Sequence, residues 1–120
     1  MKPRDIKDRT FEFALEVVRL CREFNEKTWV SKTLGKQLLR SGTSVGANVE
    51  EAQAGQSRAD FVNKYAIALK EARETIYWLR LLHESNEHAD KQIKKLQHEA
   101  EEVAKVIGAI IVSAKRNQKK

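Results

Sequence analysis

A strict apolar repeat near the end of the chain most constrains its fold. Between about residues 87 and 116 the apolar positions recur in alternating steps of three and four. They are Ile93, Leu96, Ala100, Val103, Ile107, Ile110 and Ala114. Because a helix advances 100° per residue, this spacing places them in one stripe, as in the seam of a helix bundle. A bundle seam needs partner helices.

Three earlier segments carry the same helical periodicity. The first covers about residues 5–25, and its apolar stripe is Ile6, Phe13, Ala14, Val17, Leu20, Cys21 and Phe24. The second ends near residue 54, and its repeating positions are Leu34, Leu38, Ser41, Val45, Asn48 and Ala52. The third covers about 58–84, with Phe61, Val62, Tyr65, Ala68, Leu69, Ala72, Ile76 and Leu79 on one face. Four long helices with short connections predict an all-α, antiparallel up-down-up-down four-helix bundle, as a single domain over 1–120.

Polar residues and a glycine mark the connections. Thr28 or Ser31 can cap the second helix by accepting a backbone N–H bond. Gly55 ends that helix, and Ser57 with Asp60 forms the cap-and-acid pattern that starts the third. The last six residues, KRNQKK, are expected to form a short basic tail from about residue 115.

Composition limits the class of protein further. No apolar run approaches the roughly 18 residues of a membrane span, and no apolar segment follows the opening MKPRDIKDRT to form a signal peptide. The single cysteine, Cys21, excludes an intramolecular disulfide and fits a reducing compartment. We therefore expect a cytoplasmic protein with no membrane partner.

The stretch RSGTSVGANVEEA, residues 40–52, concentrates small side chains inside the second helical segment. This stretch does not match the pattern of a phosphate-binding loop, because neither Gly42 nor Gly46 is followed by lysine. The small residues instead allow a neighbouring helix to approach closely. Asn48 falls at the edge of the apolar stripe, and since a buried amide must be hydrogen-bonded we interpret it as a structural polar residue.

Basic residues gather in two places. The net charge is +6, and residues 27–49 contain no acid. The candidate phosphate-binding residues are Lys27, Lys32, Lys36 and Arg40 in that segment and Lys115, Arg116, Lys119 and Lys120 in the tail. Such clusters suit a polyanion through phosphate neutralisation. A solvated helix face and a frayed C-terminus explain them equally well.

Two helices carry more apolar surface than one core needs. The surplus residues are Phe11, Leu15, Val18, Ile67, Tyr77, Trp78 and Leu81. Since a large exposed apolar patch usually marks an interface, these residues predict self-association.

Enzymatic chemistry has little support in the sequence. His83 and His88 in HESNEH are five residues apart, whereas the zinc-protease pattern needs two histidines four apart on one helical face. Cys21 lies in a core stripe, which favours a buried hydrophobe over a nucleophile. The glutamates have basic neighbours at helical spacing, which favours ion pairs. We expect no metal, no cofactor and no small-molecule substrate.

The chain also resembles a known family. RSGTSVGANVEEA, followed by SRADFVNKYAIALKEARETIYWLRLL and a heptad-patterned last helix, is similar to the four-helix-bundle proteins of the 23S ribosomal RNA intervening-sequence family, to which the accessory protein of diversity-generating retroelements is related. The resemblance implies a small bacterial, cytoplasmic protein that forms a homopentameric ring with a basic surface, binds nucleic acid and has no known enzymatic activity. The family signatures fall on Ser41, Val45, Asn48 and Glu51 and on Ala72, Arg73 and Glu74. This chain departs from many relatives in having two adjacent acids, Glu50 and Glu51, and in its basic tail.

Two classes of function remain. One is a non-enzymatic, homo-oligomeric nucleic-acid-binding protein, for RNA or for RNA and DNA, with low sequence specificity. The other is a protein-interaction scaffold without nucleic-acid binding, in which Tyr77, Trp78 and Leu81 anchor another protein. No recognised base-reading motif is present, so the sequence predicts no base specificity.

Overall fold

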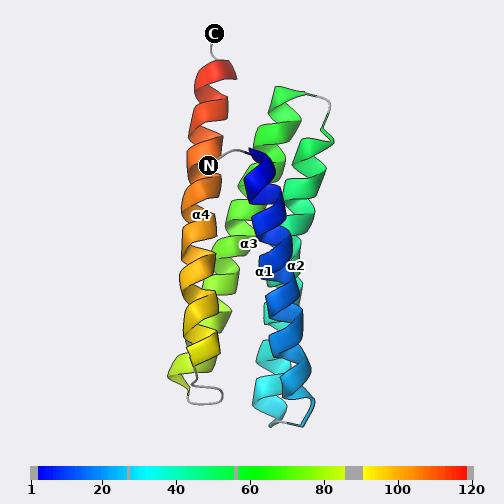
Figure 1. The fold of residues 1–120 in the computed structure, drawn as a ribbon, viewed down its shortest axis with the longest axis vertical. Helices are drawn as coiled ribbons and strands as arrows, with labels where there is room; N and C mark the ends of the chain where they lie inside the picture. The colour runs from blue at the N-terminus through cyan, green and yellow to red at the C-terminus, as the bar shows by residue number, and fades with distance from the viewer. Residues whose placement is uncertain (1–2, 27, 56, 86–90, 119–120) are drawn as a thin grey trace.

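The protein is a bundle of four antiparallel helices (Figure 1). The computed structural model describes residues 3–26, 28–55, 57–85 and 91–118. Its helices are α1 (Pro3–Arg22), the short 3₁₀ helix η1 (Glu23–Glu26), α2 (Trp29–Gln53), α3 (Arg58–Glu84) and α4 (Lys91–Gln118). Within these residues there is no strand, and successive long helices run in opposite directions. The predicted all-α up-down-up-down bundle is confirmed.

The helices are arranged as a square around one long core. Each helix contacts the next one in the chain, and α4 closes the square against α1. The diagonal pairs, α1 with α3 and α2 with α4, do not pack on each other. The bundle measures 52 × 20 × 19 Å. Any feature on α1 therefore lies on the opposite side of the molecule from a feature on α3.

The predicted seam of α4 divides between two core clusters. Ile93, Leu96 and Ala100 join the cluster at the α1–α2 turn, and Val103 and Ile107 join the cluster at the other end. The seam differs from the prediction near its end. Ile110 is only half-buried, although it packs against the cluster that contains Ile6, Val103 and Ile107.

The helix ends follow the predicted capping residues. Thr28 caps α2, with its Oγ1 accepting from the Ser31 backbone N–H at 3.2 Å. Ser57 caps α3, with its Oγ accepting from the Asp60 N–H at 3.1 Å. α4 continues as helix to Gln118, two residues past the end near residue 116 that the apolar repeat predicted.

The small residues of α2 let α1 approach closely, as predicted. Two glycines of α2 face α1 and a third faces η1, each at a position where an added Cβ would meet a neighbouring atom. The pairs are Gly35 with the Phe24 ring, Gly42 with Val17 and Gly46 with the Thr10 backbone. A Cβ would lie 3.0 Å from two Val17 methyl groups and 3.2 Å from the Thr10 carbonyl oxygen, which is tighter than ordinary van der Waals contact. These close contacts compensate for the helix propensity that glycine lacks, about 1 kcal/mol per residue.

A charged fork joins α1 to α4, the least extensively packed neighbouring pair. Arg9 Nε donates to Glu99 Oε2 at 2.6 Å, and Arg9 Nη2 donates to Glu99 Oε1 at 2.7 Å. This hydrogen bonding to Glu99 is the main cause that raises the pKa of Arg9. Such two-point geometry fixes orientation as well as distance, so it sets how α1 lies along α4.

Candidate nucleic-acid interface

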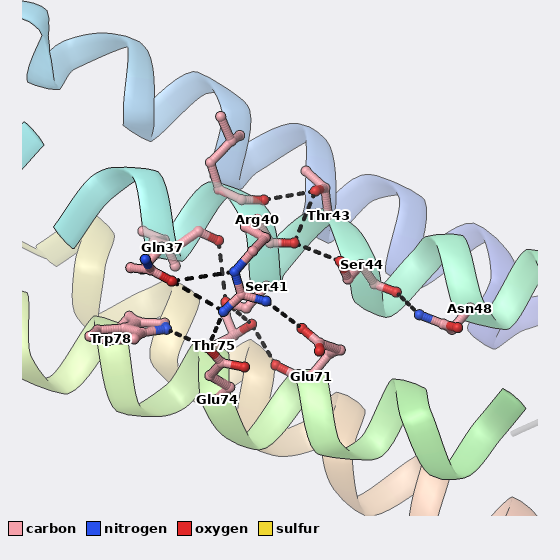
Figure 2. A network of polar contacts seen from close by, with 12 residues as sticks. Gln37, Arg40, Ser41, Thr43, Ser44, Asn48, Glu71, Glu74, Thr75 and Trp78 are labelled. Atoms are coloured by element: carbon pink, nitrogen blue, oxygen red, sulfur yellow. Dashed lines mark hydrogen bonds and ion pairs between the residues drawn. The ribbon is translucent and has the colours of Figure 1, made fainter. Parts of the chain in front are cut away.

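A polar network crosses from α2 to α3 at the middle of the bundle (Figure 2). Arg40 forms ion pairs with Glu71, at 3.3 Å, and with Glu74, and its Nε donates to Gln37 at 3.3 Å. Trp78 Nε1 donates to Glu74 Oε1 at 3.1 Å. Arg40 is thus engaged by two carboxylates of α3, although the sequence placed it among the candidate phosphate contacts.

Two buried hydroxyl groups lie beneath this network. Ser41 and Thr75 are both fully buried, and their hydroxyl oxygens are 2.9 Å apart. Thr75 Oγ1 also lies 2.7 Å from the Glu71 carbonyl oxygen, and Ser41 Oγ lies 3.4 Å from that of Leu38. Each hydroxyl therefore has a partner on its own helix and one across the helix contact, as buried polar groups require.

Asn48 is hydrogen-bonded within its own helix. Its Nδ2 donates to the Ser44 carbonyl at 2.8 Å, and the residue is half-buried (Figure 2). The polar link between helices is instead made by Ser41 and Thr75. The sequence did not predict this hydrogen bond between the helices. Its one signal was Ser41, a polar residue at a position in the apolar stripe of the second helix.

The outer face of α2 carries two exposed lysines. Lys32 and Lys36 are one helical turn apart, and no ion pair is assigned to either among the described residues. They form the α2 basic row. Of the other candidates in the acid-free segment, Arg40 is held by α3 and Lys27 lies outside the described residues.

A second basic row, which the sequence reasoning missed, follows α3. Lys70, Arg73 and Arg80 are exposed and spaced by three and seven residues, which places them on one face; we call them the α3 basic row. Tyr77 lies on the same face and is 53% exposed. In the described part of the chain no ion pair is assigned to these three cations. Their helical spacing was the signal that could have identified them.

The Arg40 network affects the charge of this face. Glu71 and Glu74 are the acids on α3 nearest in sequence to Lys70 and Arg73. Because Arg40 pairs with both carboxylates, its single positive charge offsets one of their two negative charges. The α3 basic row thus lies beside partly compensated acids, and no ion pair is assigned to its three cations among the described residues.

The C-terminal candidates separate into two groups. Lys115 and Arg116 are exposed in the last turns of α4. Lys119 and Lys120 lie outside the described residues.

The surplus apolar residues of α1 point away from the core. Phe11 is 60% exposed, and Leu15 and Val18 are half-buried on the same outward side. We call these three residues the α1 apolar face. Its position explains why they fall outside the core stripe of the sequence.

The apolar residues of α3 that were predicted to mediate self-association differ from one another in how exposed they are. Ile67, Trp78 and Leu81 are half-buried, and Trp78 packs against the core cluster. Tyr77 meets Trp78 edge to face with 5.1 Å between ring centroids. Tyr77 is therefore the exposed member of this set, and it belongs to the same face as the α3 basic row.

Comparison with known proteins decides the family. The family model described as "23S rRNA-intervening sequence protein" matches residues 3–109. This chain belongs to the 23S rRNA-intervening sequence protein family. A crystal structure of a protein with unknown function, from the S23 ribosomal protein family of Bacteroides thetaiotaomicron, is 44% identical, with a TM-score of 0.81. The match covers 88% of this chain and 97% of that one. No curated protein matches the sequence.

The sequence signatures by which the chain resembles the 23S rRNA-intervening sequence proteins meet in the α2–α3 contact. Ser41 and Glu74 belong to the polar network, and Val45 and Ala72 are buried in the core. Arg73 is exposed in the α3 basic row. Ser41, Val45, Ala72 and Glu74 therefore serve helix packing, whereas Glu51 and Arg73 are exposed to solvent.

Candidate catalytic groups do not come together in this family member. Cys21 Sγ donates to the Gly35 carbonyl at 3.4 Å, and burial raises its thiol pKa to about 11, which disfavours the nucleophilic thiolate. Among the described residues no three metal-ligating side chains form a cluster. His83 lies near the end of α3, and His88 lies outside the described residues. None of the described helices is both long enough and apolar enough to cross a membrane.

Proposed function

We propose that this member of the family is a non-enzymatic homo-oligomer that binds nucleic acid, RNA or RNA and DNA, with little sequence preference. The observation that carries the proposal is the pair of exposed basic rows on neighbouring helices, α2 and α3. Their five cations, Lys32, Lys36, Lys70, Arg73 and Arg80, are assigned no acid partner among the described residues. Exposed cations without an internal ion pair can neutralise phosphates directly, because no ion pair has to be broken first.

The chemistry of these rows favours contact with the nucleic-acid backbone. Lysine and arginine side chains on a helix surface attract phosphates, which carry no sequence information. Tyr77 on α3 and Trp29 on α2, three residues before Lys32 and 77% exposed, each offer a ring on which an unpaired base can stack. Such stacking adds affinity for single strands and gives little selection among bases.

Self-association would multiply these contacts. The α1 apolar face and the half-buried apolar residues of α3 lie on diagonally opposite helices. Two different patches on opposite sides of a subunit are what a head-to-tail contact requires, and such contacts close into rings when the rotation permits. The resemblance of the sequence implies five copies. A ring would present each basic row several times to one strand, which raises affinity through effective concentration.

Fluorescence anisotropy with labelled RNA and DNA of unrelated sequences tests the proposal. We expect salt-sensitive binding to each, and replacing Lys70, Arg73 and Arg80 by Gln should reduce the dependence of log K on log salt by about three units, roughly one per lost phosphate contact. Replacing Lys32 and Lys36 should reduce it by about two on the same basis.

A matched control is Lys105→Gln, which removes an exposed cation that is already paired with Glu102 at 3.3 Å. It should leave the salt dependence nearly unchanged. Absence of binding to any of the nucleic acids at low salt by a folded, oligomeric wild-type protein would contradict the proposal and favour the protein-interaction scaffold.

A further inference from the structure

An apolar groove lies at the end of the bundle where α1 begins. Residues at the end of α2, the start of α3 and the end of α4 line it, and its volume is about 680 Å³. Ala52, Phe61, Val106 and Ile110 contribute most of its apolar wall, and Arg58 is the charged residue that lines it. The groove is separate from both basic rows and from the α1 apolar face.

The groove continues the path of α1. In the square of helices, α1 lies between α2 and α4, with α3 diagonally opposite, and the groove has α2, α4 and α3 around it in the same way. Figure 1 shows that α1 starts below the end of α4 and below the α2–α3 turn. The groove therefore lies beside the part of α4 that extends past the start of α1 (Figure 1).

The part of α4 beside the groove has the composition of a buried helix. Residues 106–114, VIGAIIVSA, contain no charged side chain. A helix that is apolar on all sides is normally buried, yet Ala109 and Ser113 on the groove wall are exposed. Val106, Ile110 and Ile111 in this stretch are only half-buried, and Val112 is 52% exposed.

The charge at the groove selects among possible occupants. Arg58 has no ion pair assigned among the described residues, and Arg116 follows Ser113 by three positions on the same flank of α4. We propose that this groove binds an acidic amphipathic helix of a partner protein, whose apolar face would pack against Phe61, Val106 and Ile110. Its acids would lie near Arg58 and Arg116. A nucleic acid would leave the apolar wall uncovered.

A designed peptide tests this groove without knowledge of the natural partner. The probe is a labelled peptide of about 15 residues, with leucines at steps of three and four and glutamates on the other face, long enough to be partly helical. We expect saturable binding in fluorescence anisotropy. Two controls, a scrambled peptide of equal composition and a peptide with lysine for every glutamate, should bind at least about fivefold more weakly, the first for lack of an apolar face and the second through charge repulsion.

Substitutions in the protein locate the binding site. Arg58→Glu removes the cation at the groove, and Ser113→Glu places an acid on the exposed wall of the groove. Each substitution should reduce the affinity for the acidic peptide at least about fivefold. Lys94→Glu makes the same charge change as Arg58→Glu at the opposite end of α4 and should change affinity less than about twofold. Circular dichroism of each variant verifies that the bundle is folded.

The other outcomes overturn the proposal. No saturable peptide binding by the wild type, or equal loss in Lys94→Glu and Arg58→Glu, would exclude a specific acidic-helix site. If Ser113→Glu instead reduces the oligomer size in light scattering, a second copy of this chain covers the groove. RNA binding measured on the same variants reports on the basic rows separately, so failure here leaves the proposed function untouched.

Discussion

At the scale of single residues, glycine positions decide how closely α2 approaches α1 and η1. Gly35→Ala adds a Cβ against the buried Phe24 ring, so we expect a loss of about 1–3 kcal/mol of stability from overpacking, partly offset by about 1 kcal/mol of helix propensity. Gly108→Ala adds a Cβ with no atom within 4 Å and should gain about 0.5–1 kcal/mol. Urea unfolding at one protein concentration measures both. Equal effects of the two substitutions would contradict the close approach.

Cys21 gives a residue-scale prediction about pH. Burial raises the pKa of its thiol from 9.0 to about 11 in the folded state, so between these values the unfolded chain loses its proton first. Stability should therefore fall as pH rises from about 9 to about 11. Tyr65, whose pKa burial also raises, contributes in the same direction. The contribution of the thiol is measured by comparing the unfolding of the wild type and of Cys21→Ala across this pH range. The variant should lose less stability as the pH rises, and identical pH profiles would count against a buried thiol.

Two residue assignments show what a sequence pattern omits. Arg40 lies in an acid-free segment, which predicted a free cation, but its partners Glu71 and Glu74 are 31 and 34 positions away on another helix. Periodicity gives the face of a helix and not its register against a neighbour, so such pairings cannot be predicted from it. The α3 basic row was detectable, because Lys70, Arg73 and Arg80 share one face of a single helix.

At the scale of elements, the hydroxyl pair between α2 and α3 is the next testable feature. Thr75→Val preserves shape and removes a partner of Ser41, so we expect a loss of about 1–2 kcal/mol from a buried polar group with fewer hydrogen bonds. The Ser41→Ala, Thr75→Val double variant should lose less than the sum of the single losses, because both partners are then gone. Thr33→Val, at an exposed hydroxyl bonded within its own helix, is the control. Strict additivity would show that the two hydroxyls are not coupled.

The types of the helices were predictable, but their ends and offsets were not. Apolar steps of three and four identified four helices because the core stripes are long and the caps at Thr28 and Ser57 are local signals. The last helix was expected to end near residue 116 and extends to Gln118, because Lys115 and Arg116 are compatible with a solvated helix end. The groove was also missed: it depends on how far α4 extends past α1, which is a property of the packed pair.

At the scale of the whole molecule, assembly and nucleic-acid binding are separable by one substitution. Phe11 is 60% exposed on the α1 apolar face, with no part in the core clusters, so Phe11→Glu should leave the bundle folded while disfavouring contact between copies. We expect light scattering to show a smaller species than the wild type. Trp78→Ala is a poorer test, because Trp78 also packs on the core and donates to Glu74.

The same variant should distinguish avidity from the affinity of a single subunit. Phe11→Glu changes no cation of either basic row, so its binding to RNA of about 10 nucleotides should resemble that of the wild type, whereas binding to RNA of about 60 nucleotides should weaken at least about tenfold once repeated subunits are lost. Asp8→Asn and Glu16→Gln remove carboxylates at exposed or half-exposed positions of α1 and test whether a charge change on this helix by itself alters assembly; both should leave assembly intact. An equal loss for short and long RNA would place Phe11 at the nucleic-acid contact itself. A fully retained oligomer would instead remove the α1 apolar face from the interface between copies.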